Sequence, residues 1–120
     1  MAAGTVSISI GFNATKDGVT VAGSGSLSLT MAGTEMIGNT QTIGTSSEAL
    51  TLGDVSTIGY VLVKNLDATN YVEVSLDNSQ TQILAKLLAG EFALLKPNTA
   101  TLYAKANTSS VSLFVAAVEL

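Results

Sequence analysis

Apolar and polar residues alternate along much of the chain, and the alternation is clearest in residues 59–77. Tyr60 begins an aromatic and β-branched run, and from Tyr71 onward the pattern is strict. Val72, Val74 and Leu76 fall on one face, and Tyr71, Glu73, Ser75 and Asp77 fall on the other. A period of two residues is typical of a β-strand with one buried and one solvated face. We therefore predict two strands joined by a polar turn over residues 66–70, and we interpret them as two central strands of a sandwich.

Similar patterns recur on both sides of this segment. We predict further strands at 35–44, 81–88, 91–96, 99–106 and 111–120, with a short apolar segment at 46–52. Residues 81–88 also fit helical spacing, but their length and their neighbours favour a strand. Turns recur about every 8–12 residues, which is typical of an all-β sandwich or barrel. The predicted fold of residues 35–120 is therefore an antiparallel, jelly-roll-like β-sandwich of about eight strands.

The first 34 residues predict a β-hairpin or arm. Strands are expected at 5–12, 19–21 and 27–31, with a turn at 13–18 that contains the hairpin-favouring pair Asp17-Gly18. Residues 22–26 are too rich in Gly and Ser for a firm strand. Within them, Gly23-Ser24-Gly25 resembles a fragment of a phosphate-binding loop, but it lacks the lysine and the following helix, so we interpret it as a linker or bulge. This segment either extends the domain or pairs with a neighbouring subunit.

The last strand, 111–120, is apolar on both faces. Val111, Leu113 and Val115 lie on one face, and Phe114, Ala116 and Val118 lie on the other. Such a strand is either central in a sandwich with a covered outer face or part of a subunit interface.

Composition argues against catalysis. The chain has no His, no Cys and no Arg among its 120 residues. His is the usual general base near neutral pH and the commonest metal ligand, and Arg is the side chain that binds phosphate or carboxylate in a bidentate manner. We therefore expect neither an enzyme nor a cofactor or metal site, and we predict no catalytic residue.

Charge bears on the partners. The net charge is −4, and the five lysines are scattered, so we expect no nucleic-acid binding. No apolar run approaches the roughly 18 residues that would span a membrane, and the N-terminus does not resemble a secretory signal. Charged residues make up only 12% of the chain, and a surface with so little charge suits a protein that is packed in an assembly.

Two groups of residues were weighed as candidate binding sites. Asp67, Glu73 and Asp77, with Asn70, form the densest polar group, but a calcium site needs several oxygen ligands that converge from one loop. We interpret these residues as turn-forming and solvated. Tyr60, Tyr71 and Tyr103, with the three phenylalanines, could line a sugar-binding face, although scattered strand aromatics are more often core or cross-strand residues.

Residues 35–120 resemble small β-sandwich virion structural proteins of tailed bacteriophages. The resemblance rests on GYVLVKNLDATNYVEV, on the LAGEFALLKP segment and on LYAKANTSSVSLFVAAVEL. It implies a non-enzymatic virion protein similar to capsid decoration or cement proteins, which forms a homo-oligomer, expected to be a trimer. The implied partners are its own copies and the major capsid protein or other virion proteins, at the capsid surface rather than the tail. The alternative is a tail or fibre component with a carbohydrate-binding β-sandwich.

Overall fold

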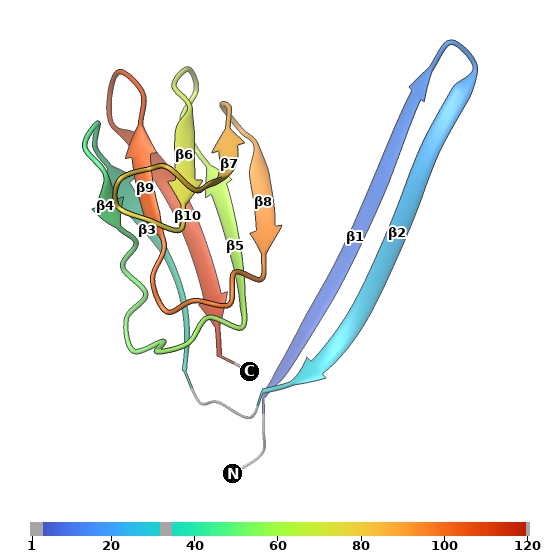
Figure 1. Cartoon of the computed structure of the whole chain (residues 1–120). Coiled ribbons are helices and arrows are strands. Elements are labelled where there is room, and N and C mark those ends of the chain that lie inside the picture. Colours follow the sequence, from blue (N-terminus) through green and yellow to red (C-terminus); the bar gives the residue numbers. More distant parts are fainter. Residues whose placement is uncertain (1–3, 32–34, 120) are drawn as a thin grey trace. The chain divides into compact units, whose positions relative to one another are not determined.

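The computed structural model describes residues 4–31 and 35–119, and every regular element in these ranges is a β-strand. The chain divides into two compact units, residues 1–34 and residues 35–120 (Figure 1). The first unit contains β1 (Thr5–Lys16) and β2 (Val19–Thr30). The second contains β3 (Met36–Ile43), β4 (Glu48–Ala49), β5 (Tyr60–Asn65), β6 (Val72–Ser75), β7 (Ile83–Leu87), β8 (Phe92–Leu95), β9 (Tyr103–Ala106) and β10 (Val111–Val118).

The second unit is an antiparallel sandwich. Its described strands form two four-stranded sheets with the orders β3-β10-β5-β8 and β4-β9-β6-β7. The pairings are nested: β3 pairs with β10, β4 with β9, β5 with β8, and β6 with β7. The second unit therefore has the topology of one long antiparallel hairpin that is folded over on itself. The pairs β10–β5 and β9–β6 complete the two sheets. This arrangement is a jelly roll, so the predicted fold class is confirmed.

The two strands of residues 59–77 are inner strands of the sandwich, but they do not pair with each other. β5 lies between β10 and β8, whereas β6 lies between β9 and β7 in the opposite sheet. The segment after Asn65 therefore crosses from one sheet to the other. Alternation reveals which face of a strand is buried, but it does not reveal the hydrogen-bonded neighbour, so the same pattern fits a hairpin and a crossing connection.

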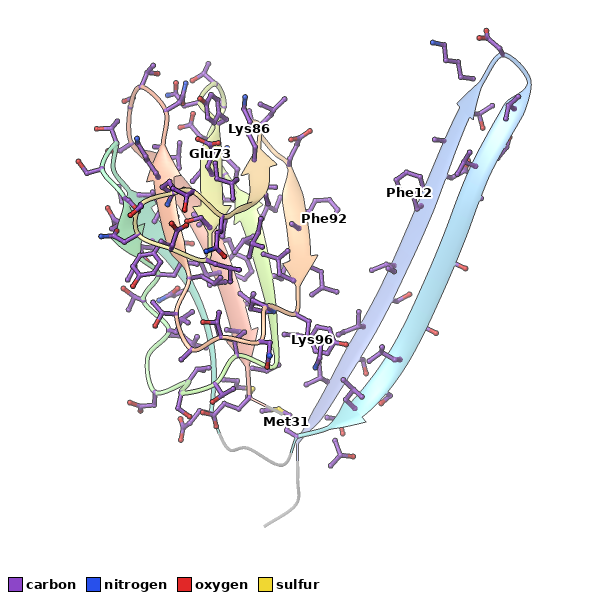
Figure 2. The ribbon with its side chains drawn as sticks, viewed as in Figure 1. Phe12, Met31, Glu73, Lys86, Phe92 and Lys96 are labelled. Atoms are coloured by element: carbon purple, nitrogen blue, oxygen red, sulfur yellow. The ribbon has the colours of Figure 1, made fainter. Side chains whose placement is uncertain are left out.

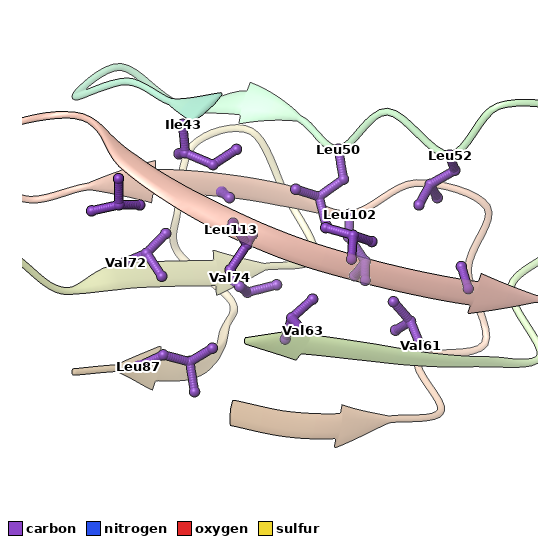
Figure 3. Packing of buried hydrophobic residues seen from close by; sticks show 14 of the residues in the cluster. Ile43, Leu50, Leu52, Val61, Val63, Val72, Val74, Leu87, Leu102 and Leu113 are labelled. Atoms are coloured by element: carbon purple, nitrogen blue, oxygen red, sulfur yellow. The ribbon is translucent and has the colours of Figure 1, made fainter. Parts of the chain in front are cut away.

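The core lies between the two sheets, as Figure 3 shows. It is almost entirely aliphatic, with Val61, Val63 and Leu113 from one sheet and Val72 and Val74 from the other, all fully buried. Fully burying an aliphatic side chain of this size contributes about 1.5–3 kcal/mol each. The ambiguous segment 81–88 forms β7, and Leu87 belongs to this core, which confirms the strand interpretation.

The first unit is a regular two-stranded hairpin. All 12 residues of β1 pair in continuous register with β2, and the connecting residues Asp17 and Gly18 have φ values of 53° and 79°. Two positive φ values in a two-residue loop define a type I′ turn.

The predicted strand ends in this hairpin were wrong. β1 runs on to Lys16, and residues 22–26 form regular strand rather than a linker or bulge. Continuous pairing with β1 provides every glycine of β2 with a cross-strand partner, and this pairing outweighs the weak intrinsic strand preference of Gly and Ser.

Candidate functional site on the outer face of one sheet

The outer face of the β4-β9-β6-β7 sheet is charged at its centre, next to the pair Ser75 and Tyr103. In its centre, Glu73 of β6 lies opposite Lys86 of β7 (Figure 2). On its other side Glu73 lies opposite Lys105 of β9. The Lys86 Nζ lies 4.2 Å from the centre of the Tyr71 ring. Alternating opposite charges across strands are ordinary for a sheet face that meets water.

The outer face of the β3-β10-β5-β8 sheet is mostly apolar. Residues directly opposite one another on adjacent antiparallel strands point to the same side, and those alternating with the buried core residues point outward. One outward row joins Met36, Val118 and Tyr60, and the next joins Gly38, Ala116, Leu62 and Leu94. A third row joins Thr40, Phe114, Lys64 and Phe92. We call the apolar members of these rows the apolar sheet face: Met36, Tyr60, Leu62, Phe92, Leu94, Phe114, Ala116 and Val118.

Several of these side chains are well exposed. Met36 is 70% exposed and Phe92 is 67% exposed, while Phe114 and Val118 are half-buried by their neighbours on the sheet. Three rows on four strands cover about 300 Å², from the usual strand spacing and rise. Patches of this size are at the scale that marks interaction sites on monomers.

The polar groups on this sheet face are cationic or hydroxylic. Lys64 lies between Phe92 and Phe114 in register, and the Lys96 Nζ lies 4.7 Å from the centre of the Tyr60 ring. Long lysine stems cover apolar surface while the ammonium group reaches water. The apolar members of the face can therefore be buried against another surface while the ammonium groups of these two lysines reach water.

Two of the three acidic candidate residues, Asp67 and Asp77, lie in turns, and Glu73 lies in β6. The Asp67 Oδ2 accepts hydrogen bonds from the backbone N–H groups of Asn70 at 2.6 Å and Thr69 at 3.0 Å. These bonds stabilise the carboxylate, so the pKa of Asp67 lies below its usual value of 3.8.

Asp77 has an equivalent role in the turn before β7. Its carboxylate accepts hydrogen bonds from the Thr81 hydroxyl and from the backbone N–H of Gln82, and these bonds lower the pKa of Asp77 below 3.8. Asp67 and Asp77 each cap a different loop, and Glu73 lies on the charged sheet face between two lysines. Among residues 4–31 and 35–119, no group of three or more His, Cys, Asp or Glu could hold a metal ion.

Sequence reasoning missed Asn65, which organises the crossing between the sheets. Its side chain is fully buried, and its Nδ2 donates to the backbone carbonyls of Asn70 at 2.8 Å and Leu87 at 3.0 Å. Its Oδ1 accepts from the backbone N–H of Asp67 at 2.9 Å. The sequence signal for this role was that Asn65 closely follows the apolar run of residues 60–63. A side-chain amide at such a place is either exposed or hydrogen-bonded to buried backbone groups.

The aromatic residues divide between different surfaces. Tyr60, Phe92 and Phe114 lie on the apolar sheet face, whereas Tyr71 and Tyr103 lie on the outer side of the opposite sheet. Phe12 belongs to the hairpin. The three tyrosines therefore do not form one binding face.

One finding on helices and three comparisons with known proteins complete the description. In the described part of the chain no helix has the length and hydropathy to cross a membrane. The sequence matches no protein-family model and no curated protein, and the fold matches no solved structure. The resemblance to phage virion proteins therefore stays a prediction.

Proposed function

We propose that the chain is a non-enzymatic structural protein of a tailed-bacteriophage virion, which decorates or cements the capsid shell as a homo-oligomer, expected to be a trimer. One observation carries this proposal: a jelly-roll domain with one charged outer face and one apolar outer face. A solvated domain has no need of a face with Met36 and Phe92 about two thirds exposed. A subunit of an assembly uses such a face as a contact.

The mechanism is burial of the apolar sheet face against virion subunits. A fully buried aromatic anchor commonly carries more than 1 kcal/mol of binding free energy, and Phe92 and Phe114 are the aromatic candidates near the aliphatic centre. The low proportion of charged residues, 12%, reduces repulsion between closely spaced copies.

The proposal is tested by co-sedimentation of the purified full chain with capsid shells and, separately, with tails of the particle it comes from. We expect binding to shells, and we expect Phe92→Ser to weaken it at least about tenfold, as loss of an aromatic hot spot does. The matched control is Glu73→Gln on the charged sheet face, which should bind shells as the natural chain does. Failure of the natural chain to bind either structure would contradict the virion role.

A carbohydrate-binding role on a tail or fibre is the second candidate. It is favoured by the position of Tyr60, Phe92 and Phe114 on one face, since aromatic rings stack on sugars. The aliphatic majority of that face argues for a protein contact instead. Binding to tails that free glycans displace, together with absence from shells, would favour this second role.

A further inference from the structure

Besides the apolar sheet face of the sandwich, the hairpin also carries an exposed apolar surface. Its continuous register places every second residue of β1 opposite an apolar residue or a glycine of β2 on one side of the ribbon. We call this surface the hairpin face: Val6, Ile8, Ile10, Phe12, Ala14, Val19, Val21, Leu27 and Leu29. The opposite side carries Ser, Thr, Asn, Ala22 and Gly11.

The hairpin face is exposed, above all toward the turn. Phe12 is 65% exposed, Val19 is 64% exposed and Val21 is 60% exposed. A two-stranded hairpin is marginally stable in water on its own, because neither side of a two-stranded ribbon is covered. Apart from Lys16, which lies opposite Val19, one side of the ribbon is apolar or glycine, and such a side is suited to pack on another apolar surface.

We infer that the hairpin face of one copy packs on the apolar sheet face of a second copy. This inference rests on the proposed function, because it names the occupant of the same sheet face. It also replaces the sequence-based expectation of backbone pairing with a neighbour by packing of one apolar face on another.

The relief of the two surfaces is complementary. On the hairpin, Ile10 lies opposite Gly25 and Phe12 lies opposite Gly23, so large side chains form a ridge along β1 beside a low strip on β2. On the sheet, the Gly38–Ala116 row is low between the rows of Met36 and Phe114. A Cβ placed on Gly38 would meet no atom within 4 Å. A single large side chain such as Phe12 fits the low position at Gly38 and Ala116, and sheets that pack face to face lie about 10 Å apart.

The hairpin is longer than the strands of the sandwich. A 12-residue strand is about 40 Å long, whereas the longest strands of the sandwich have eight residues and span about 27 Å. The sheet of any one copy therefore covers only part of the length of the hairpin face.

The area agrees with a stable contact. Because the apolar sheet face covers about 300 Å², one contact buries about 600 Å² when both surfaces are counted, and two reciprocal contacts bury about 1,200 Å². Specific protein interfaces bury about 1,200–2,000 Å² in total. Reciprocal exchange of hairpins therefore supplies enough area to hold two copies together.

The natural chain lacks cysteine, so single cysteines can be placed at will. Full-length Ala14→Cys chains are mixed with isotope-labelled Ala116→Cys chains and treated with a short bismaleimide, and mixed cross-linked pairs are counted by mass. The control replaces Ala14→Cys with Asn13→Cys, which lies next along β1 on the polar side of the hairpin. We expect Ala14→Cys to give at least about tenfold more mixed pairs than Asn13→Cys, because a docked hairpin raises the effective concentration of the thiol.

Three results would overturn the inference: equal yields for the two cysteines, a monomeric natural chain in sedimentation at high concentration, or cross-linking within single chains of the Ala14→Cys/Ala116→Cys double variant at high dilution. The last result would place the hairpin on its own domain. The shell-binding assay separates this failure from failure of the proposed function, because a chain that binds shells without exchanging hairpins keeps the virion role and loses only the exchange.

Discussion

At the scale of single residues, buried and loop-capping polar groups determine how the chain passes between sheets. Asn65 makes three hydrogen bonds from a fully buried position, and Asp67, two residues later, caps the same crossing with its carboxylate. The turn role of Asp67 and Asp77 could be predicted from residue type, because Asp in a polar break between strands bonds nearby backbone N–H groups. The role of Asn65 could not, since one of its partners, the backbone carbonyl of Leu87, is 22 residues away in the sequence.

The substitution Asn65→Ala should lower the free energy of unfolding of the sandwich by about 3 kcal/mol, because the buried Leu87 carbonyl, the partly buried Asn70 carbonyl and the Asp67 N–H lose their partner. Chemical denaturation followed by tyrosine fluorescence measures this, since all three tyrosines lie in the second unit. The exposed Asn78→Ala serves as the control and should change stability by less than about 0.5 kcal/mol. Equal effects of the two substitutions would contradict the assigned role.

Acid should destabilise the sandwich through Asp67 and Asp77. Both have a pKa below 3.8 in the folded chain, so their stabilising contribution is present above that pH and is lost as the pH falls through the folded values. Asp67→Asn and Asp77→Asn should therefore flatten the loss of stability between neutral pH and pH values below 3.8. Denaturation midpoints measured across this range check the expectation, and an unchanged pH dependence in the double variant would refute it.

At the scale of elements, alternation and turn residues predicted which segments are strands, including β7 and the doubly apolar β10. They could not predict which strands are neighbours. β5 and β6 follow one another in sequence yet lie in opposite sheets, and the apolar sheet face gathers residues from four strands through register alone. Part of this face could still be found in the sequence, because Phe114, Ala116 and Val118 made the outer side of β10 apolar.

The hairpin depends on its turn. Gly18 has a φ of 79°, which a β-branched residue adopts only with strain, so Gly18→Val should destabilise the β1–β2 pairing by about 1 kcal/mol or more. Hydrogen exchange of the β1 and β2 amides should accelerate. Gly11→Ala is the matched control, because Gly11 has no positive φ and a Cβ there meets no atom within 4 Å. Similar exchange in both variants would show that the turn does not limit the hairpin.

At the scale of the whole molecule, the two units differ in how they bury their apolar side chains. The sandwich covers its own core and leaves one outer face apolar, whereas the hairpin has no core and leaves one whole side apolar. Predicting this from sequence was possible only in part. Residues 22–26 suggested a linker or bulge because they are rich in Ser and Gly. In the structure they pair with β1, with Ser24 and Ser26 on the polar side of the hairpin and Gly23 and Gly25 on the apolar side.

The nested strand pairing has a consequence for the order of folding. β10 is the last strand made and lies between β3 and β5, so the first strand of the sandwich has no partner in its sheet until residues 111–118 arrive. The hairpin needs only contacts between residues close in sequence and can form within microseconds, while the sandwich must close a loop of nearly its full length and folds more slowly. During synthesis the hairpin can therefore form before the sandwich, and its apolar side is exposed while the sandwich is still incomplete.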